Sequence, residues 1–181
     1  MSVAVIVYNG LLELELGAAL TALNLGGGEG TTRTVSRSRA SVVGVGGLVT
    51  TPEVMFASLE PPRAVFVPGG PGAARLAKEP LAKTFLASQA SRGAWIAASG
   101  SGVLALGAAG LLQGRAVSAS PDFAEDLWDF GPSDVRTSGV TEDGPVITAP
   151  GGLGALDVAL RLCAHLWGQD TSASVALRLG R

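Results

Sequence analysis

The sequence contains few of the residues that carry most enzyme chemistry, since its 181 residues include one cysteine and one histidine. The single cysteine, Cys163, excludes an internal disulfide and a cysteine-based metal cluster. No group of histidine, cysteine and acidic residues has metal-ligand spacing. Charged residues make up only 15% of the chain and the net charge is −2, so no basic field would attract nucleic acid or an anionic membrane. We therefore expect no metal, no cofactor and no direct nucleic-acid partner.

Long hydrophobic runs are also missing. No apolar stretch approaches the ~20 residues that a membrane span requires. The apolar run from Val3 to Tyr8 follows no basic segment, so we interpret it as a first strand and not as a secretory signal. These absences predict a soluble cytoplasmic protein. The chain is nevertheless 47% hydrophobic, and its length suits one domain with a sizeable core. We expect a single domain over residues 1–181.

Apolar runs of strand length alternate with helical segments along the chain. Val3–Tyr8 and Ala64–Val67 are typical of strands buried on both faces, and residues 103–112 are apolar all round, which predicts a central buried helix. This alternation predicts an α/β fold with a mainly parallel sheet covered on both faces. The other expected strands are 32–36, 95–98, 116–118, 135–136 and 146–148, with a hairpin over 41–51 and a polar turn at 142–144; the other expected helices are 14–24, 53–59, 73–78, 81–91, 122–128, 155–167 and 172–179.

Residues 95–115 have the pattern of the strand, tight turn and buried helix that carry a nucleophile in many α/β enzymes. The apex of this turn is Gly100, which has no side chain with which to attack. Turn residues of this kind adopt strained backbone that costs about 1–3 kcal/mol for a residue with a side chain, and glycine relieves the strain. The alternative is that Gly100 admits a ligand close to the backbone. Because ligands of parallel sheets bind beyond the carboxyl ends of strands, Gly69, Gly70 and residues 99–101 are candidate binding residues.

The serines on either side of Gly100 are weak nucleophile candidates. Neither Ser99 nor Ser101 lies in a Gly-x-Ser-x-Gly pattern, and an active serine requires a base that takes its proton. The only histidine, His165, is distant in the chain. We expect one of the two serines to cap the helix that follows, and we retain Ser101 as a weak catalytic candidate.

The helix expected over residues 155–167 has a polar stripe and an apolar face. His165 shares the stripe with Asp157 and Arg161 at spacings of four, so we expect it to face solvent and to be supported by i,i+4 pairs. Cys163 lies on the apolar face and is expected to be a buried, inert thiol.

Four segments, in order and spanning nearly the whole chain, resemble the ThiJ/PfpI superfamily, the glutamine-amidotransferase-like group that includes isonitrile hydratases. The likeness is greatest to the isonitrile-hydratase branch and to the related N-terminal domains of some AraC-type regulators. It implies a flavodoxin-like three-layer sandwich that is usually dimeric. The segments are Val-Ile-Val-Tyr-Asn-Gly-Leu-Leu-Glu-Leu-Glu-Leu-Gly (5–17), Val-Pro-Gly-Gly-Pro-Gly (67–72), the turn at 100 with Ala-Ala-Gly-Leu-Leu-Gln-Gly-Arg (108–115), and Ile-Thr-Ala-Pro-Gly-Gly-Leu-Gly-Ala-Leu-Asp-Val-Ala-Leu (147–160).

The resemblance also implies a site made of a cysteine at the turn, an acid from the first loop and often a histidine after the following helix. The acid matches Glu15, the cysteine position matches Gly100, and the histidine position falls at about Ser120. Backbone N–H groups near Gly70 and Ser101 match the family's oxyanion-binding positions. The surroundings of the family site are therefore kept, while its cysteine and histidine are replaced.

Three functions are consistent with this pattern. The first is a non-catalytic homologue that binds a small polar or anionic ligand at the position of the family's site, or acts through its homodimer. The second is a cysteine-independent hydro-lyase or hydrolase in which Glu15 is the general acid/base; otherwise Glu15 is an ordinary acid in the first turn of a helix. The third is a freestanding regulator sensing domain that acts through a protein partner. The candidate binding residues are Gly69, Gly70, Ser99, Gly100, Ser101 and Ser120.

Overall fold

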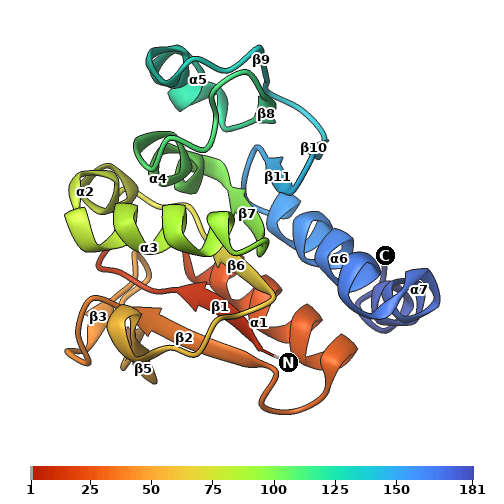
Figure 1. Cartoon of the computed structure of the whole chain (residues 1–181). Coiled ribbons are helices and arrows are strands. Elements are labelled where there is room, and N and C mark those ends of the chain that lie inside the picture. The colour runs from red at the N-terminus through yellow and green to blue at the C-terminus, as the bar shows by residue number, and fades with distance from the viewer. Residues whose placement is uncertain (1) are drawn as a thin grey trace.

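A seven-stranded sheet forms the middle layer of the molecule in the computed structural model, which describes residues 2–181 (Figure 1). Its strand order is β10–β11–β7–β6–β1–β2–β5. The strands pair in parallel except for β10, which is antiparallel to β11. This confirms the predicted α/β fold with a mainly parallel sheet. The bounds are β1 Val3–Ile6, β2 Thr32–Ser36, β5 Val54–Met55, β6 Ala64–Val67, β7 Trp95–Ser99, β10 Thr141–Asp143 and β11 Val146–Ala149.

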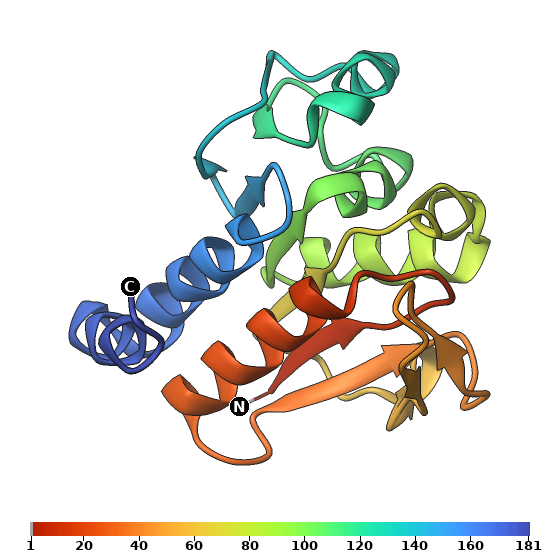
Figure 2. The ribbon, with the colours of Figure 1, turned by 180° about the vertical axis from the view of Figure 1, so that it is seen from behind.

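Helices cover both faces of this sheet, which explains why its central strands are continuous apolar runs. Every residue of β1 and β6 is buried, as expected of strands without a solvent-facing side. α1 and α6 lie over one face and α2, α3 and α4 over the other (Figures 1 and 2). The helices are α1 Glu13–Gly27, α2 Ala73–Lys78, α3 Pro80–Ser91, α4 Val103–Ala108, α5 Ala124–Leu127, α6 Gly154–Trp167 and α7 Gln169–Arg178.

Smaller elements lie outside the main sheet. β3 (Val42–Val43) and β4 (Val49–Thr50) form the hairpin that the sequence predicted. β8 (Ala116–Ser118) and β9 (Asp134–Arg136) pair in parallel. Single 3-10 turns are η1 Phe56–Ser58, η2 Gly100–Gly102, η3 Pro121–Phe123 and η4 Trp128–Phe130.

Several predicted bounds were wrong for identifiable reasons. The first helix was expected to end at Asn24 but continues to Gly27, where the small glycines allow close packing on α6: a Cβ at Gly26 would lie 3.0 Å from the Cys163 sulfur. The buried helix expected over 103–112 ends at Ala108, because the chain turns out of the helix at Gly110, whose φ is +77°. Residues 53–59 form β5 and η1 instead of a helix, 122–128 are divided among η3, α5 and the start of η4, and the polar turn expected at 142–144 begins within strand β10.

The loops that follow the parallel strands meet at one edge of the sheet. The loop after β1 contacts the loop after β6, since the N–H of Leu12 donates to the Gly69 carbonyl at 2.8 Å and that of Gly72 to the Gly10 carbonyl at 3.1 Å. Within residues 2–181, no helix is long and apolar enough to cross a membrane.

Candidate functional site

The chain leaves β7 through a sharp turn at Gly100 and enters η2 and α4 directly. We call residues 99–102 the elbow. Gly100 has a φ of +54°, in the left-handed region that side-chain-bearing residues seldom adopt. A Cβ at this position would lie 3.2 Å from Oε1 of Glu15 and 3.4 Å from the Cα of Gly151. The turn therefore has the geometry of a nucleophile-bearing elbow, with glycine where the reactive side chain would stand.

Glu15, in the first turn of α1, lies directly beneath this elbow and is only 1% exposed. Its Oε2 accepts hydrogen bonds from the Gly69 N–H at 2.6 Å and from the Ser99 hydroxyl. Its Oε1 accepts from the Gly152 N–H at 2.8 Å. All three partners are donors, so both carboxyl oxygens of Glu15 act as acceptors. Because these donors lie at the ends of β6, β7 and β11, one carboxylate joins three loops.

The elbow serines do not cap a helix, so this prediction was wrong. Neither η2 nor α4 has a side-chain cap, because both hydroxyls reach across to other segments. Ser99 is fully buried and donates to Glu15. Ser101 is bonded to Gly70 twice: its Oγ donates to the Gly70 carbonyl at 2.9 Å and accepts from the Gly70 N–H at 2.9 Å. The Gly70 amide, expected at an oxyanion-binding position, therefore already has an acceptor.

Ser120 precedes η3 and takes no part in these hydrogen bonds. Its carbonyl accepts the Phe123 N–H at 3.0 Å. Within residues 2–181, no described hydrogen bond joins Ser120 to Glu15, Gly70 or Gly100. The structure thus brings Glu15, Gly69, Gly70, Ser99, Gly100 and Ser101 together.

His165 and Cys163, both on α6, take no part in the elbow. His165 is exposed, as expected, but its Nε2 lies 2.8 Å from Oε1 of Glu142, and its ring stacks on Trp95 with 3.9 Å between centroids. The predicted i,i+4 support was wrong, since Asp157 binds Arg181 at 2.5 Å.

Cys163 is fully buried, as predicted, and its thiol donates to the Ala22 carbonyl at 3.5 Å. Burial raises the pKa of this thiol to about 11, which makes it unreactive at neutral pH.

Two residues near the elbow were not singled out by sequence reasoning. The buried Tyr8 hydroxyl donates to the Pro68 carbonyl at 2.6 Å, and burial, together with the Glu15 charge, raises its pKa above the usual range. Glu13 accepts the N–H groups of Gly46 at 2.7 Å and Leu48 at 3.2 Å, so it holds the β3–β4 hairpin. These hydrogen bonds, chiefly that of Gly46, lower the pKa of Glu13. The only sequence signal for Glu13 was its position in the same helical turn as Glu15, and this position does not indicate a contact with the hairpin.

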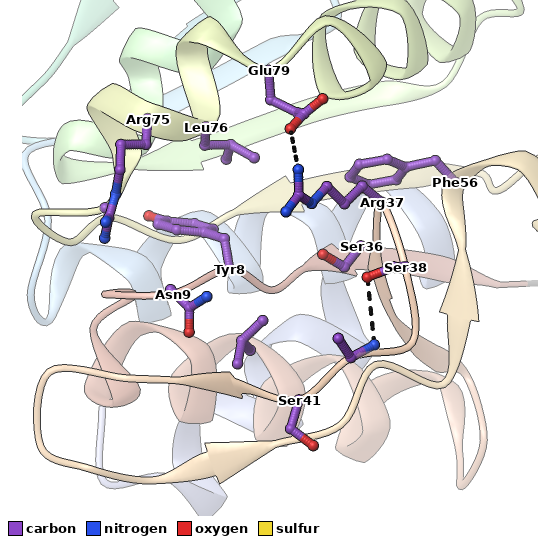
Figure 3. Close-up of a pocket in the computed structure, with 13 residues that line it drawn as sticks. Tyr8, Asn9, Ser36, Arg37, Ser38, Ser41, Phe56, Arg75, Leu76 and Glu79 are labelled. Carbon is purple, nitrogen blue, oxygen red and sulfur yellow. Dashed lines mark hydrogen bonds and ion pairs between the residues drawn. The ribbon is translucent and has the colours of Figure 1, made fainter.

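Two cavities at the surface of residues 2–181 are lined by residues other than those of the elbow. One cavity of about 330 Å³ lies beside the ends of β1 and β2, where Tyr8, Ser36 and Arg75 are among its lining residues (Figure 3). A shallower groove follows α1 and β2 near Asn24 and Glu53. Ser99 and Ser101 are 0% and 4% exposed. The elbow is therefore packed closed, and the open space lies next to it.

A three-layer sandwich with a strand–turn–helix elbow above a buried acid from the first helix defines a ThiJ/PfpI-type α/β protein. The model of the DJ-1/PfpI family matches residues 1–165. The chain belongs to the DJ-1/PfpI family.

Known relatives agree with this assignment. The chain is 33% identical over 133 residues to an isonitrile hydratase of Pseudomonas putida, a match that covers 74% of this chain and 58% of that protein. Drosophila melanogaster DJ-1beta superposes with a TM-score of 0.91 at 26% identity, covering 99% of this chain and 98% of that one. A ThiJ/PfpI family protein from Pseudomonas syringae superposes with a TM-score of 0.90 at 27% identity, covering 99% of this chain and 74% of that one.

Proposed function

We propose that this chain is a DJ-1/PfpI family member without cysteine chemistry at its elbow, and that it acts as a non-catalytic, small-ligand-binding protein. The observation that carries the proposal is Gly100 at the apex of the elbow, with the only cysteine, Cys163, buried in α6. The state of Glu15 adds support. A carboxylate that is 1% exposed and accepts three hydrogen bonds is suited to fixing loops, whereas a general acid or base must reach the proton that it transfers.

Turnover measurements test this proposal. The purified full chain and Glu15→Gln would be assayed on isonitriles, α-oxoaldehydes and simple esters. We expect neither protein to exceed the uncatalysed rate. Turnover by the unmodified protein that disappears in a folded Glu15→Gln variant would contradict the proposal. Thermal unfolding of the variant serves as the control for folding.

The 33% sequence identity to the isonitrile hydratase of Pseudomonas putida favours a second candidate function, that of a cysteine-independent hydro-lyase acting on isonitriles. In that function Glu15 would be the general acid/base, helped by the amides near Gly70 and Ser101. The isonitrile arm of the assay decides between the two. Restoring the family nucleophile with Gly100→Cys alone is expected to give no cysteine-type activity, because Ser120 stands where the family resemblance places a histidine.

We also propose that the protein assembles as a homodimer through the β3–β4 hairpin. Val43, Val45, Leu48 and Val49 of this hairpin are 45–62% exposed, and Leu14 at the start of α1 is 58% exposed. Glu13 connects the hairpin to α1, so Leu14 and the hairpin side chains lie on neighbouring segments. Exposed apolar patches of this kind typically mark protein interfaces.

Sedimentation or light scattering of Val49→Glu tests the dimer. We expect a dimer for the unmodified chain and a monomer for the variant, since a buried unpaired charge opposes association. Leu177→Glu, which changes a 77% exposed leucine on α7, is the matched control and should remain dimeric. A monomeric unmodified chain at micromolar concentration would overturn the proposal.

A further inference from the structure

The 330 Å³ cavity beside the elbow has the position of a ligand site in a parallel sheet. It is lined by Tyr8 and Asn9, which follow β1, and by residues 36–38 at the end of β2. Ligands of open α/β sheets bind beyond these carboxyl ends. The volume lies at the lower end of the range for small-molecule sites, about 300–1,000 Å³. The space therefore suits a small molecule and not a large cofactor.

Hydrogen-bond donors without partners face this cavity. The guanidinium of Arg75, the Ser36 hydroxyl and Nδ2 of Asn9 have no hydrogen-bond partner among residues 2–181. The side chain of Asn9 is fixed through its amide oxygen, because Oδ1 accepts the Val43 N–H at 2.9 Å. Its NH₂ group is therefore left as a donor. A cavity whose spare polar groups are mainly donors favours a ligand rich in acceptors.

The charges around the cavity sum to a single positive charge. Arg37 is paired with Glu79 at 3.2 Å (Figure 3), whereas Arg75 has no acidic partner in the described part of the chain. Arg75 also lies close to the loop after β1: a Cβ at Gly10 would stand 3.7 Å from its Nη2. A singly charged anion would balance Arg75, while a doubly charged phosphate would remain partly uncompensated beside Glu79.

Apolar side chains form one part of the wall, while Ser38 and Ser41 also line the cavity. The Tyr8 ring lies between Arg75 and Arg37 in Figure 3, and Leu76 and Phe56 line the same cavity. Phe56 is fixed by stacking on Phe85, with 4.7 Å between the ring centroids. The Tyr8 hydroxyl is occupied by the Pro68 carbonyl, so its ring serves as a flat surface and not as a proton donor.

We infer that this cavity binds a small organic carboxylate, whose head group is held by Arg75 and Asn9 and whose body lies against Tyr8, Leu76 and Phe56. A planar carboxylate matches the fork of a guanidinium through two parallel hydrogen bonds. The inference rests on the proposed binding function and moves the ligand from the closed elbow to the neighbouring cavity.

NMR titration of the full chain with benzoate tests this inference. Tyr8 is the only tyrosine, so its ring signals report on the cavity without ambiguity. We expect benzoate to shift these signals and the Ser36 amide. Arg75→Gln should weaken binding at least about tenfold, as expected when a charge-assisted pair is lost. Arg178→Gln, which removes an exposed arginine on α7, should bind like the unmodified chain.

Each other outcome has a defined meaning. Equal binding of neutral benzamide, or tighter binding of phenyl phosphate, would overturn the assignment of a carboxylate. Shifts at Gly70 and Gly100 with Tyr8 unchanged would place the ligand at the elbow, which overturns the cavity proposal and leaves the binding function intact. No shift with any of the three probes would overturn the cavity site. Failure of the non-catalytic function itself is seen separately, as turnover of isonitriles, α-oxoaldehydes or esters.

Discussion

The elbow and the neighbouring cavity lie at the same edge of the sheet but differ in how their polar groups are paired. At the elbow, Glu15, Ser99 and Ser101 are buried, and each bonds to a group of another segment of the chain. At the cavity, Arg75 and Ser36 have no partner in the described chain. Fully paired buried groups stabilise a fold, whereas unpaired donors at an open cavity can exchange water for a ligand. Resemblance to a family site therefore identifies ancestry, and the pairing of polar groups identifies where binding remains available.

Glu15→Ala should have the largest effect, because it leaves three donors without their acceptor. The donors of Gly69 and Ser99 are buried, and an unpaired buried donor costs about 1–3 kcal/mol, so we expect at least about 2 kcal/mol of lost unfolding free energy. Denaturant unfolding measures it. Glu13→Ala is the control, since Glu13 also accepts two backbone N–H groups but at an exposed hairpin. Equal losses in the two variants would contradict the closed elbow.

Gly100→Ala should destabilise by about 1–3 kcal/mol, the usual cost of placing a side chain at positive φ. The new methyl group would also stand 3.2 Å from Oε1 of Glu15. Gly17→Ala, within α1 and with open space around a Cβ, should instead stabilise by about 0.5–1 kcal/mol. Thermal unfolding of both variants checks the difference in sign. A Gly100→Ala protein as stable as the unmodified chain would refute the strain argument.

Ser101→Ala removes the acceptor of the Gly70 N–H and should cost about 1–2 kcal/mol. Ser91→Ala offers the matched comparison, because its hydroxyl also donates to a carbonyl, that of Ser88 at 2.8 Å, but at an exposed position. We expect little change there. If chemical denaturation gives the same midpoint for both variants, the two hydrogen bonds between Ser101 and Gly70 do not stabilise the fold.

The smallest effect concerns pH. Hydrogen bonds from the hairpin lower the pKa of Glu13 below its ordinary value of 4.5. A carboxyl whose pKa is lower in the folded state contributes stability above its unfolded pKa and loses it as the pH falls through its folded pKa. Glu13→Gln should therefore flatten the acid side of a plot of melting temperature against pH, and leave its alkaline side unchanged. Identical acid limbs would contradict this role.

Local patterns predicted most of the fold. Four elements have the bounds that residue types alone suggested, namely β2, β6, α2 and β8. Such elements can be predicted because their signal is a run or a period of apolar residues that are neighbours in the sequence. The elbow was located in the same way. Its hydrogen bonds were not predictable, since Ser99 and Glu15 are 84 residues apart and Ser101 and Gly70 are 31 apart.

Partners distant in the sequence also explain why Glu13 and Glu15 differ in role and why the cavity was not predicted. The two acids lie in one helical turn, yet one faces the hairpin and the other three strand ends. Capping was the local expectation for the serines, and tertiary partners replaced it. The cavity combines residues from four separate segments between Tyr8 and Glu79, none of which carries a motif.

Amide hydrogen exchange tests the closed elbow most directly. Gly69 and Gly46 both donate a backbone N–H to a glutamate carboxylate, one buried and one exposed. We predict that the Gly69 and Gly70 amides exchange only through unfolding of the domain, with protection close to the global free energy of unfolding, while Gly46 exchanges through local opening. Rapid exchange at Gly69 and Gly70, comparable to that at Gly46, would show that the elbow opens in the native state, and would contradict a closed elbow whose polar groups serve the fold.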